Sequence, residues 1–177
     1  MVSSLDSRAI FDAILQSAAV GLFHSLNIAL APMPAKADEI DEETGNKFLA
    51  NISFDSEKVR GDLLLAVPSG VLKLIGPELT HGAPAEEVVK DLANQLLGRI
   101  KNRVAQFGTL LSVGLPVRGN PEVVGRRSVE PLGAVSLYSF RTLRGVVTVN
   151  VRGTMDRSAL NYSGAVQVFN EGDVLIF

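Results

Sequence analysis

Carboxylate, amide and glycine residues recur at spacings of three and four along residues 84–119, the part of this chain best suited to chemistry. Asp91 and Asn94 are three positions apart, and Gly98 follows Asn94 by four. At these spacings side chains share one face of an α-helix. The sequence lacks cysteine, and it lacks the common nucleotide-binding, metalloprotease and serine-hydrolase motifs. The other members of this polar face are Glu87, Gln95, Lys101 and Asn102.

The element that must position these residues is a long helix predicted over 84–107. Pro84 suits the first helical position, and Gly108 lies where a helix would end. The helix would hold about 24 residues and measure about 36 Å. Its opposite face is apolar with a recurrence of four residues, as expected for a helix packed on a core. The apolar residues are Val88, Val89, Leu92, Ala93, Leu96, Leu97, Ile100 and Val104.

Two residues of the polar face are unusual for a helix interior. Any amphipathic helix needs a solvated face, and that is one interpretation of the pattern. However, Gly98 costs a helix about 1 kcal/mol relative to alanine, and Asn94 is a mediocre helix former without a capping position here. Gly98 therefore indicates that something approaches the helix backbone closely at this point.

The segment Asp91–Lys101 (DLANQLLGRIK), followed by Gly108, Ser112 and the PVRG of 116–119, resembles the CheC/CheX/FliY family of chemotaxis phosphatases, most closely its CheX-like members. The family motif is an acid, two spacers and an asparagine on a long helix. A glycine and a lysine follow on the same helix, and then comes a strand that ends near a proline and a glycine. The matching part covers 36 of the 177 residues, from 84 to 119.

The resemblance implies a role for each residue of the motif. Asn94 would orient the water that attacks the aspartyl phosphate of a CheY-like receiver domain, and Asp91 would pair with the receiver's lysine. The family's acid is normally glutamate, and aspartate reaches about 1.5 Å less. Closer docking at Gly98, or help from Glu87, would compensate. The expected catalytic residues are Asp91 and Asn94, the expected partner-binding residues are Glu87, Gln95, Gly98 and Lys101, and no metal is expected except Mg²⁺ on the receiver.

The resemblance also implies an α/β fold, with a mostly antiparallel sheet of about six strands, two long helices packed on it and two similar halves. It implies homodimers built by sheet extension. Hydrophobic patterning predicts the other elements. These are a helix over 5–30, strands over 48–54 and 60–67, a short helix over 68–76, strands over 109–117, 132–141 and 145–153, and a hairpin within 164–177.

The helix over 5–30 would be the counterpart of the helix over 84–107 if the two halves are similar. Its acid, Asp12, is followed three positions later by Leu15 and not by asparagine. One active face is therefore expected. The loop 122–130 carries Arg126 and Arg127, which would either hold a phosphate or a partner's carboxylates, or be solvated.

Composition favours a single domain over 1–177, with a core at about 5–153 and a C-terminal extension at about 160–177. A net charge of −2 argues against nucleic-acid binding. The most apolar stretch, 9–31, is interrupted by Asp12, Gln16, His24 and Asn27, so membrane insertion is not expected. Without cysteine or a recognisable signal peptide, a cytoplasmic location is expected.

Three functions remain open from the sequence. The first is a phosphatase for a phosphorylated CheY-like receiver domain. The second is a non-catalytic module that binds such a receiver or serves as a scaffold in a chemotaxis or flagellar-switch assembly. The third is a plain oligomerisation domain whose polar stripe is only solvated. Replacing Asn94 or lengthening Asp91 would distinguish among the three.

Overall fold

The structure is a computed structural model that describes residues 6–33, 47–120 and 134–160, apart from the side chains of 77–79 and 134–135. Two sequence predictions lie outside these residues. They concern the loop 122–130 with Arg126 and Arg127, and the C-terminal hairpin within 164–177.

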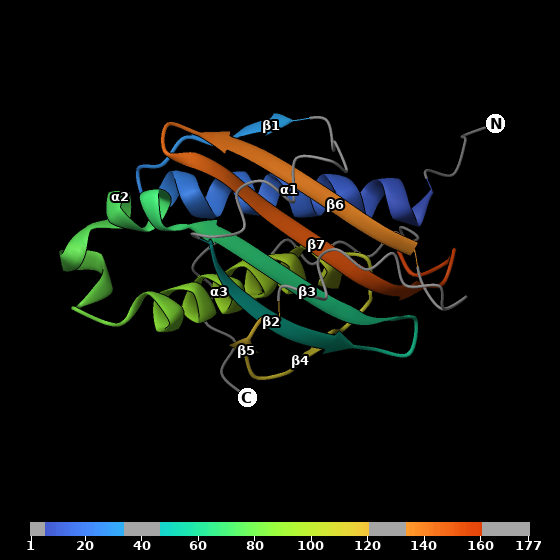
Figure 1. Ribbon diagram of the computed structural model, residues 1–177. Helices are drawn as coiled ribbons and strands as arrows, with labels where there is room; N and C mark the ends of the chain where they lie inside the picture. Colours follow the sequence, from blue (N-terminus) through green and yellow to red (C-terminus); the bar gives the residue numbers. More distant parts are fainter. Residues whose placement is uncertain (1–5, 34–46, 121–133, 161–177) are drawn as a thin grey trace.

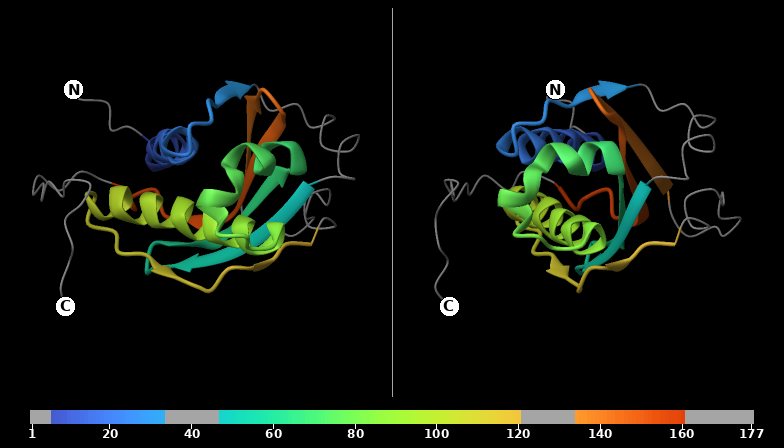
Figure 2. Two further views of the ribbon diagram at one scale, coloured as in Figure 1. Left: turned by 90° about the vertical axis from the view of Figure 1, so that its left-hand side faces the viewer. Right: turned by 60° about the vertical axis from the view of Figure 1, so that its left-hand side comes forward.

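A seven-stranded sheet with the strand order β1-β6-β7-β3-β2-β4 forms one layer, and β5 also pairs with β2. Every strand pairing is antiparallel. Helices α1 and α3 cover one face of this sheet, and α2 lies at one end of it (Figures 1 and 2). The elements in chain order are α1 (Ser7–Ser25), β1 (Ala31–Met33), β2 (Lys47–Asp55), β3 (Val59–Pro68), α2 (Ser69–Thr80), α3 (Ala85–Ala105), β4 (Ser112–Val113), β5 (Val117–Arg118), β6 (Ala134–Thr142) and β7 (Gly145–Met155).

The chain consists of two similar halves, as predicted. The first half runs α1, β1, β2, β3, and the second runs α3, β4 with β5, β6, β7. Strand β1 corresponds to β4, β2 to β6 and β3 to β7. When each strand is replaced by its counterpart, the order β1-β6-β7-β3-β2-β4 becomes the same order read backwards. The sheet is therefore pseudo-symmetric about its central β3–β7 pair, with one long helix from each half packed on the same face.

The core lies between the two long helices and the sheet. Alternate residues of the central strands point toward the helices, as the period of two requires. Leu63, Leu65 and Val67 of β3 and Val147 and Val149 of β7 have no exposed surface. The buried residues of α3 are the eight apolar positions predicted from the sequence. The pattern therefore predicts the buried face of this helix correctly.

Both long helices are shorter than predicted. Helix α1 starts after Asp6, whose side chain accepts a hydrogen bond from the Arg8 amide at 3.2 Å, and it ends at Ser25 instead of residue 30. Asn27 has a φ of 59°, and this left-handed conformation stops the helix. Helix α3 has Pro84 as its N-cap and ends at Ala105, shortly before Gly108 with a φ of 76°.

Two further predictions need correction. The short helix after β3 extends to Thr80, with a break at Gly76, where φ is 75°. The strand predicted over 109–117 exists only as β4 and β5, two residues each. Pro116 lacks an amide hydrogen and lies between β4 and β5, so it cannot donate to a continuous ladder with β2. No helix in the described ranges is long and apolar enough to cross a membrane.

Candidate functional site

Helix α3 is held on both flanks, and the face between them is left to solvent. On the α1 side, an Arg103 guanidinium donates to the Ser17 hydroxyl, and Arg99 contacts the Ser25 hydroxyl at 3.4 Å. On the other side, Arg118 of β5 forms an ion pair with Glu86 at 3.3 Å. These contacts, together with the buried face, fix the rotation of α3 about its own axis.

The structure brings the predicted site residues together on this open face. Glu87, Asp91, Asn94, Gln95 and Lys101 are all exposed, and so is Asn102. Gly98 is partly exposed. At about 100° per residue, Gly98 falls between the rows of Asn94 and Gln95, in the middle of the exposed arc. We call Glu87, Asp91, Asn94, Gln95, Gly98 and Lys101 the α3 stripe.

The members of the α3 stripe differ in whether they already have partners. The Glu87 carboxylate is bound by Lys90 at 2.6 Å, one turn along the helix. Within the described residues, the side chains of Asp91, Asn94, Gln95 and Lys101 make no hydrogen bond or ion pair. The acid and the amide three positions apart are therefore free to bind another molecule, whereas Glu87 is partly neutralised. The Glu87–Lys90 spacing was visible in the sequence, but the pairing was not predicted.

Gly98 has no packing role among the described residues. A Cβ atom added at this position would meet no described atom within 4 Å outside its own helix backbone and chain neighbours. The close approach that Gly98 indicates is therefore not made by any other described part of this chain. Gly98 leaves the backbone of α3 uncovered by a side chain in the middle of the α3 stripe.

The counterpart acid on α1 is used within the fold. Asp12 is half-buried and accepts a hydrogen bond from the Tyr138 hydroxyl of β6. Burial, and next the bond to Asp12, raise the pKa of Tyr138 well above its usual range. Arg8 of the same helix donates to the Ser136 hydroxyl at 2.5 Å. Asp12 thus ties α1 to the sheet.

Sequence reasoning missed the role of Tyr138. Its position in the alternating pattern of 132–141 already put it on the same face as Phe140. A phenol on an inward face usually requires a hydrogen-bond partner, and that was the available signal.

A pocket of about 390 Å³ lies at the other end of the molecule from α2, beside the first turn of α1. The rings of Phe11 and Phe54, with centroids 6.4 Å apart, form part of its wall, and Arg8 and Arg60 line it as well. None of its lining residues belongs to α3. It is therefore separate from the α3 stripe, and it was not foreseen from the sequence. Among the described residues, no three His, Asp or Glu side chains converge on a metal-sized site.

Comparisons with known proteins bear on the fold. No protein-family model matches the sequence, and no curated protein matches it. Among solved structures, a CheC-like superfamily protein from Shewanella sp. PV-4 matches with a TM-score of 0.62 at 16% identity, over 80% of this chain and 96% of that one. The chemotaxis protein CheX from Vibrio vulnificus matches with a TM-score of 0.62 at 16% identity, over 83% and 98% of the two chains.

The chain has the CheC-like fold. A third structure with this fold comes from a CheX–CheY–BeF₃–Mg²⁺ complex of Borrelia burgdorferi, with a TM-score of 0.57 at 12% identity, over 80% of this chain and 96% of that one. The resemblance derived from residues 84–119 is thereby confirmed as a resemblance of folds. The predicted α/β class is confirmed too, with two long helices, the short helix α2 and a sheet of seven strands instead of about six.

Proposed function

We propose that this chain binds a phosphorylated CheY-like receiver domain through the α3 stripe and hydrolyses its aspartyl phosphate. The observation that carries the proposal is the pair Asp91 and Asn94. Both side chains are exposed and have no partner among the described residues, and they lie on a helix whose rotation is fixed by its flanks. A rigid element that presents free polar groups is what a positioning site needs.

The fold supports the choice of partner. The CheX protein of similar fold from Borrelia burgdorferi is found in complex with CheY, BeF₃ and Mg²⁺. Receiver domains are phosphorylated on an aspartate, and their acyl phosphate is already reactive. A partner protein therefore needs only to position water and complete the electrostatics, without a nucleophile or a metal of its own.

In the proposed reaction, the Asn94 amide orients a water molecule in line with the phosphorus–oxygen bond that links the phosphoryl group to the receiver's aspartate. The water oxygen forms a bond to phosphorus, and the bond between phosphorus and the aspartate oxygen breaks. Inorganic phosphate and the aspartate carboxylate are released. Asp91 pairs with the receiver's lysine, and Gln95 and Lys101 add polar contacts on either side of Gly98. Mg²⁺ is expected on the receiver, where it offsets charge on the phosphoryl oxygens.

The test is phosphate release from a phosphorylated, Mg²⁺-loaded receiver domain with wild type and Asn94→Ala side by side. By analogy with the loss of one positioned donor, Asn94→Ala should slow release on the order of 10²–10³-fold. Asn102→Ala is the matched control, because Asn102 is an exposed asparagine eight positions along the same helix. Equal rates for wild type and Asn94→Ala would refute the proposed role of the amide.

A second candidate function is a receiver-binding or scaffold module without catalysis. Two observations favour it over the phosphatase. Asp91 is shorter than the glutamate of the motif, and Glu87 is held by Lys90 at 2.6 Å and so is poorly placed to substitute for it. In that case the wild-type protein should bind the phosphorylated receiver and leave the rate of phosphate release unchanged.

A further inference from the structure

The turn between β6 and β7 carries an apolar side chain into solvent on a rigid support. Leu143 is 94% exposed, more than any other large hydrophobic residue among the described ones. The turn is held by the Thr142 hydroxyl, which donates to the Gly145 carbonyl at 2.7 Å and accepts from the Arg144 amide at 3.0 Å. Leu143 therefore stands at a convex apex and does not line a groove.

Helix α2 is packed against this turn and contributes to the same surface. A Cβ atom added at Gly70 would lie 2.8 Å from the Arg144 carbonyl oxygen, so the first turn of α2 touches the turn backbone. Lys73 and Leu74 follow Gly70 by three and four positions and share its side of the helix. Lys73 is exposed, and Leu74 is 41% exposed.

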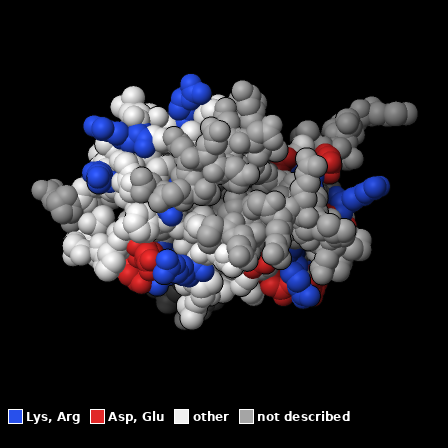
Figure 3. All heavy atoms as spheres, viewed as in Figure 1, with Lys and Arg blue, Asp and Glu red and all other residues white. Residues whose placement is uncertain are grey.

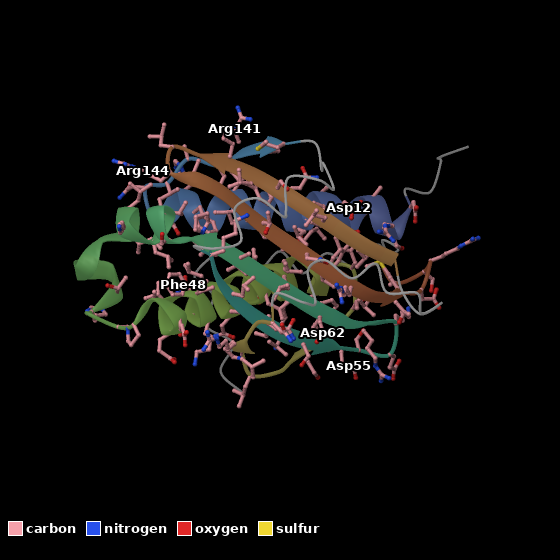
Figure 4. The ribbon with its side chains drawn as sticks, in the orientation of Figure 1. Asp12, Phe48, Asp55, Asp62, Arg141 and Arg144 are labelled. Atoms are coloured by element: carbon pink, nitrogen blue, oxygen red, sulfur yellow. The ribbon has the colours of Figure 1, made fainter. Side chains whose placement is uncertain are left out.

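Three exposed basic side chains lie at this end of the molecule. Arg141 and Arg144 are exposed and extend outward from the hairpin (Figure 4). The side chains of Lys73, Arg141 and Arg144 make no ion pair with any described residue. Three basic groups gather at this corner without a described acid among them, although the chain as a whole has a net charge of −2 (Figure 3). We call Lys73, Leu74, Arg141, Leu143 and Arg144 the basic tip.

We propose that the basic tip attaches the protein peripherally to an anionic lipid bilayer. Basic side chains are attracted to the negative headgroups, and Leu143 at the apex can enter the boundary between headgroups and acyl chains. A bilayer needs no matching shape, so a convex apex with one fully exposed leucine is sufficient. A stable protein interface buries about 800 Å² on each side around an apolar, often aromatic centre, which the basic tip does not have.

The attachment should be weak and should depend on charge. Each basic group near an anionic leaflet strengthens binding about fivefold. The double substitution Arg141→Gln/Arg144→Gln should therefore weaken vesicle binding about 25-fold. Leu143→Ser should weaken it about tenfold, because it removes the apolar group that enters the bilayer.

The experiment is co-sedimentation of the full chain with vesicles of phosphatidylcholine, with and without phosphatidylserine, at low and high salt. The expected result is sedimentation only with phosphatidylserine, reduced by salt, by Arg141→Gln/Arg144→Gln and by Leu143→Ser. Two matched controls should bind like wild type. Lys58→Gln/Arg157→Gln removes two exposed cations at the other end of the sheet, and Leu115→Ser removes a leucine that is 86% exposed outside the basic tip. Thermal melting of each variant verifies that it is folded.

Three outcomes would overturn the proposal. The first is no sedimentation with phosphatidylserine vesicles, or equal sedimentation with phosphatidylcholine alone. The second is an equal loss of binding in the control variants, which would mean that overall charge and not the basic tip is responsible. The third is salt-sensitive binding of polyglutamate without vesicle binding, which would assign the basic tip to an acidic protein.

Discussion

At the scale of single residues, two carboxylates one turn apart on α3 are in different situations. Glu87 is bound to Lys90, whereas Asp91 has no partner among the described residues. A free carboxylate on a fixed helix is available to an incoming cation, and a paired one must first release its lysine. Asp91 is therefore the acid to which the proposed partner would bind, despite its shorter reach.

Lengthening this acid tests whether its reach limits the proposed reaction. Asp91→Glu adds one methylene and restores the acid of the motif, so the rate of phosphate release should rise about tenfold, equivalent to about 1.4 kcal/mol. The measurement is kcat/KM for the phosphorylated receiver domain. Asp62→Glu makes the same change at an exposed acid of β3 and should leave the rate unchanged. An unaltered rate for Asp91→Glu in a protein that binds its partner would favour the scaffold function.

The Tyr138–Asp12 pair predicts how stability responds to alkaline pH. Burial and the bond to Asp12 raise the pKa of Tyr138 in the folded state above the value of about 10 for a free tyrosine. The unfolded chain therefore loses this proton first, and the free energy of unfolding should fall as the pH rises above about 10. In the Tyr138→Phe variant, the free energy of unfolding should fall less over this pH range, because the contribution of Tyr138 is absent.

Urea unfolding at neutral pH and at about pH 11 measures the effect. At neutral pH, Tyr138→Phe should cost on the order of 1 kcal/mol, because the hydrogen bond to Asp12 is lost. An alkaline decline that is identical in wild type and variant would contradict the assignment.

At the scale of elements, α3 combines a fully packed face with an open one, and Gly98 lies in the open one. The described surroundings do not require a glycine at this position, because no described atom outside the helix backbone and the chain neighbours lies within 4 Å of an added Cβ atom. Gly98→Ala should therefore stabilise the protein by about 1 kcal/mol through helix propensity. If a receiver domain approaches the bare backbone, the same change should weaken its binding.

Gly21→Ala is the matched control for this prediction. Gly21 lies inside α1, where an added Cβ atom would make an ordinary contact of 3.5 Å with an Arg99 guanidinium nitrogen. It should give a similar gain in thermal stability without an effect on binding. If both variants bind the receiver equally well, Gly98 does not mark a point of close approach.

The elements at the two ends of the sheet are short. Edge strand β1 has three residues and contains Pro32, and β4 and β5 have two residues each, with Pro116 between them. Short strands and prolines at an edge limit pairing with other chains. The homodimer by sheet extension, which the resemblance implies, stays a prediction, and these edges restrict the length of ladder it could use.

At the scale of the whole molecule, the two halves meet at the β3–β7 pair, and two glycines face each other there. Gly61 pairs with Gly153 in register. A Cβ atom at Gly153 would overlap the Arg60 carbonyl oxygen and lie 2.8 Å from the Gly61 Cα. The ring of Phe54 covers Gly61, with one ring carbon 3.0 Å from an added Cβ position. The junction of the halves therefore leaves no room for a side chain.

Gly153→Ala should destabilise the protein by about 1–3 kcal/mol, because backbone atoms of β3 would have to move to make room. The measurement is the free energy of unfolding in urea, compared with that of Gly98→Ala, which places the same methyl group in open space. Unchanged stability in Gly153→Ala would show that the central strands can separate without cost.

The two faces of α3 and the existence of the main helices and strands could be predicted from the sequence. Hydrophobic period is a local property, so the buried side of α3, the hairpins β2–β3 and β6–β7 and the polar stripe were predictable from residue spacing. The motif around Asp91 and Asn94 predicted the CheC-like fold as well. Local signals were less able to predict where elements stop, as the early end of α1 at Ser25, before the left-handed Asn27, and the broken strand around Pro116 show.

Which polar groups of the described residues are bonded within the fold could be seen only from the three-dimensional structure. Asp12 and Asp91 are both acids on long amphipathic helices, yet Asp12 is bonded to Tyr138, which is 126 residues away in the chain, while Asp91 faces solvent. Gly98 and Gly153 are both single glycines in regular elements, yet one borders open space and the other borders the backbone of β3. The physical reason is that hydrogen-bond partners and close packing come from segments distant in sequence, which the spacing of neighbouring residues does not encode.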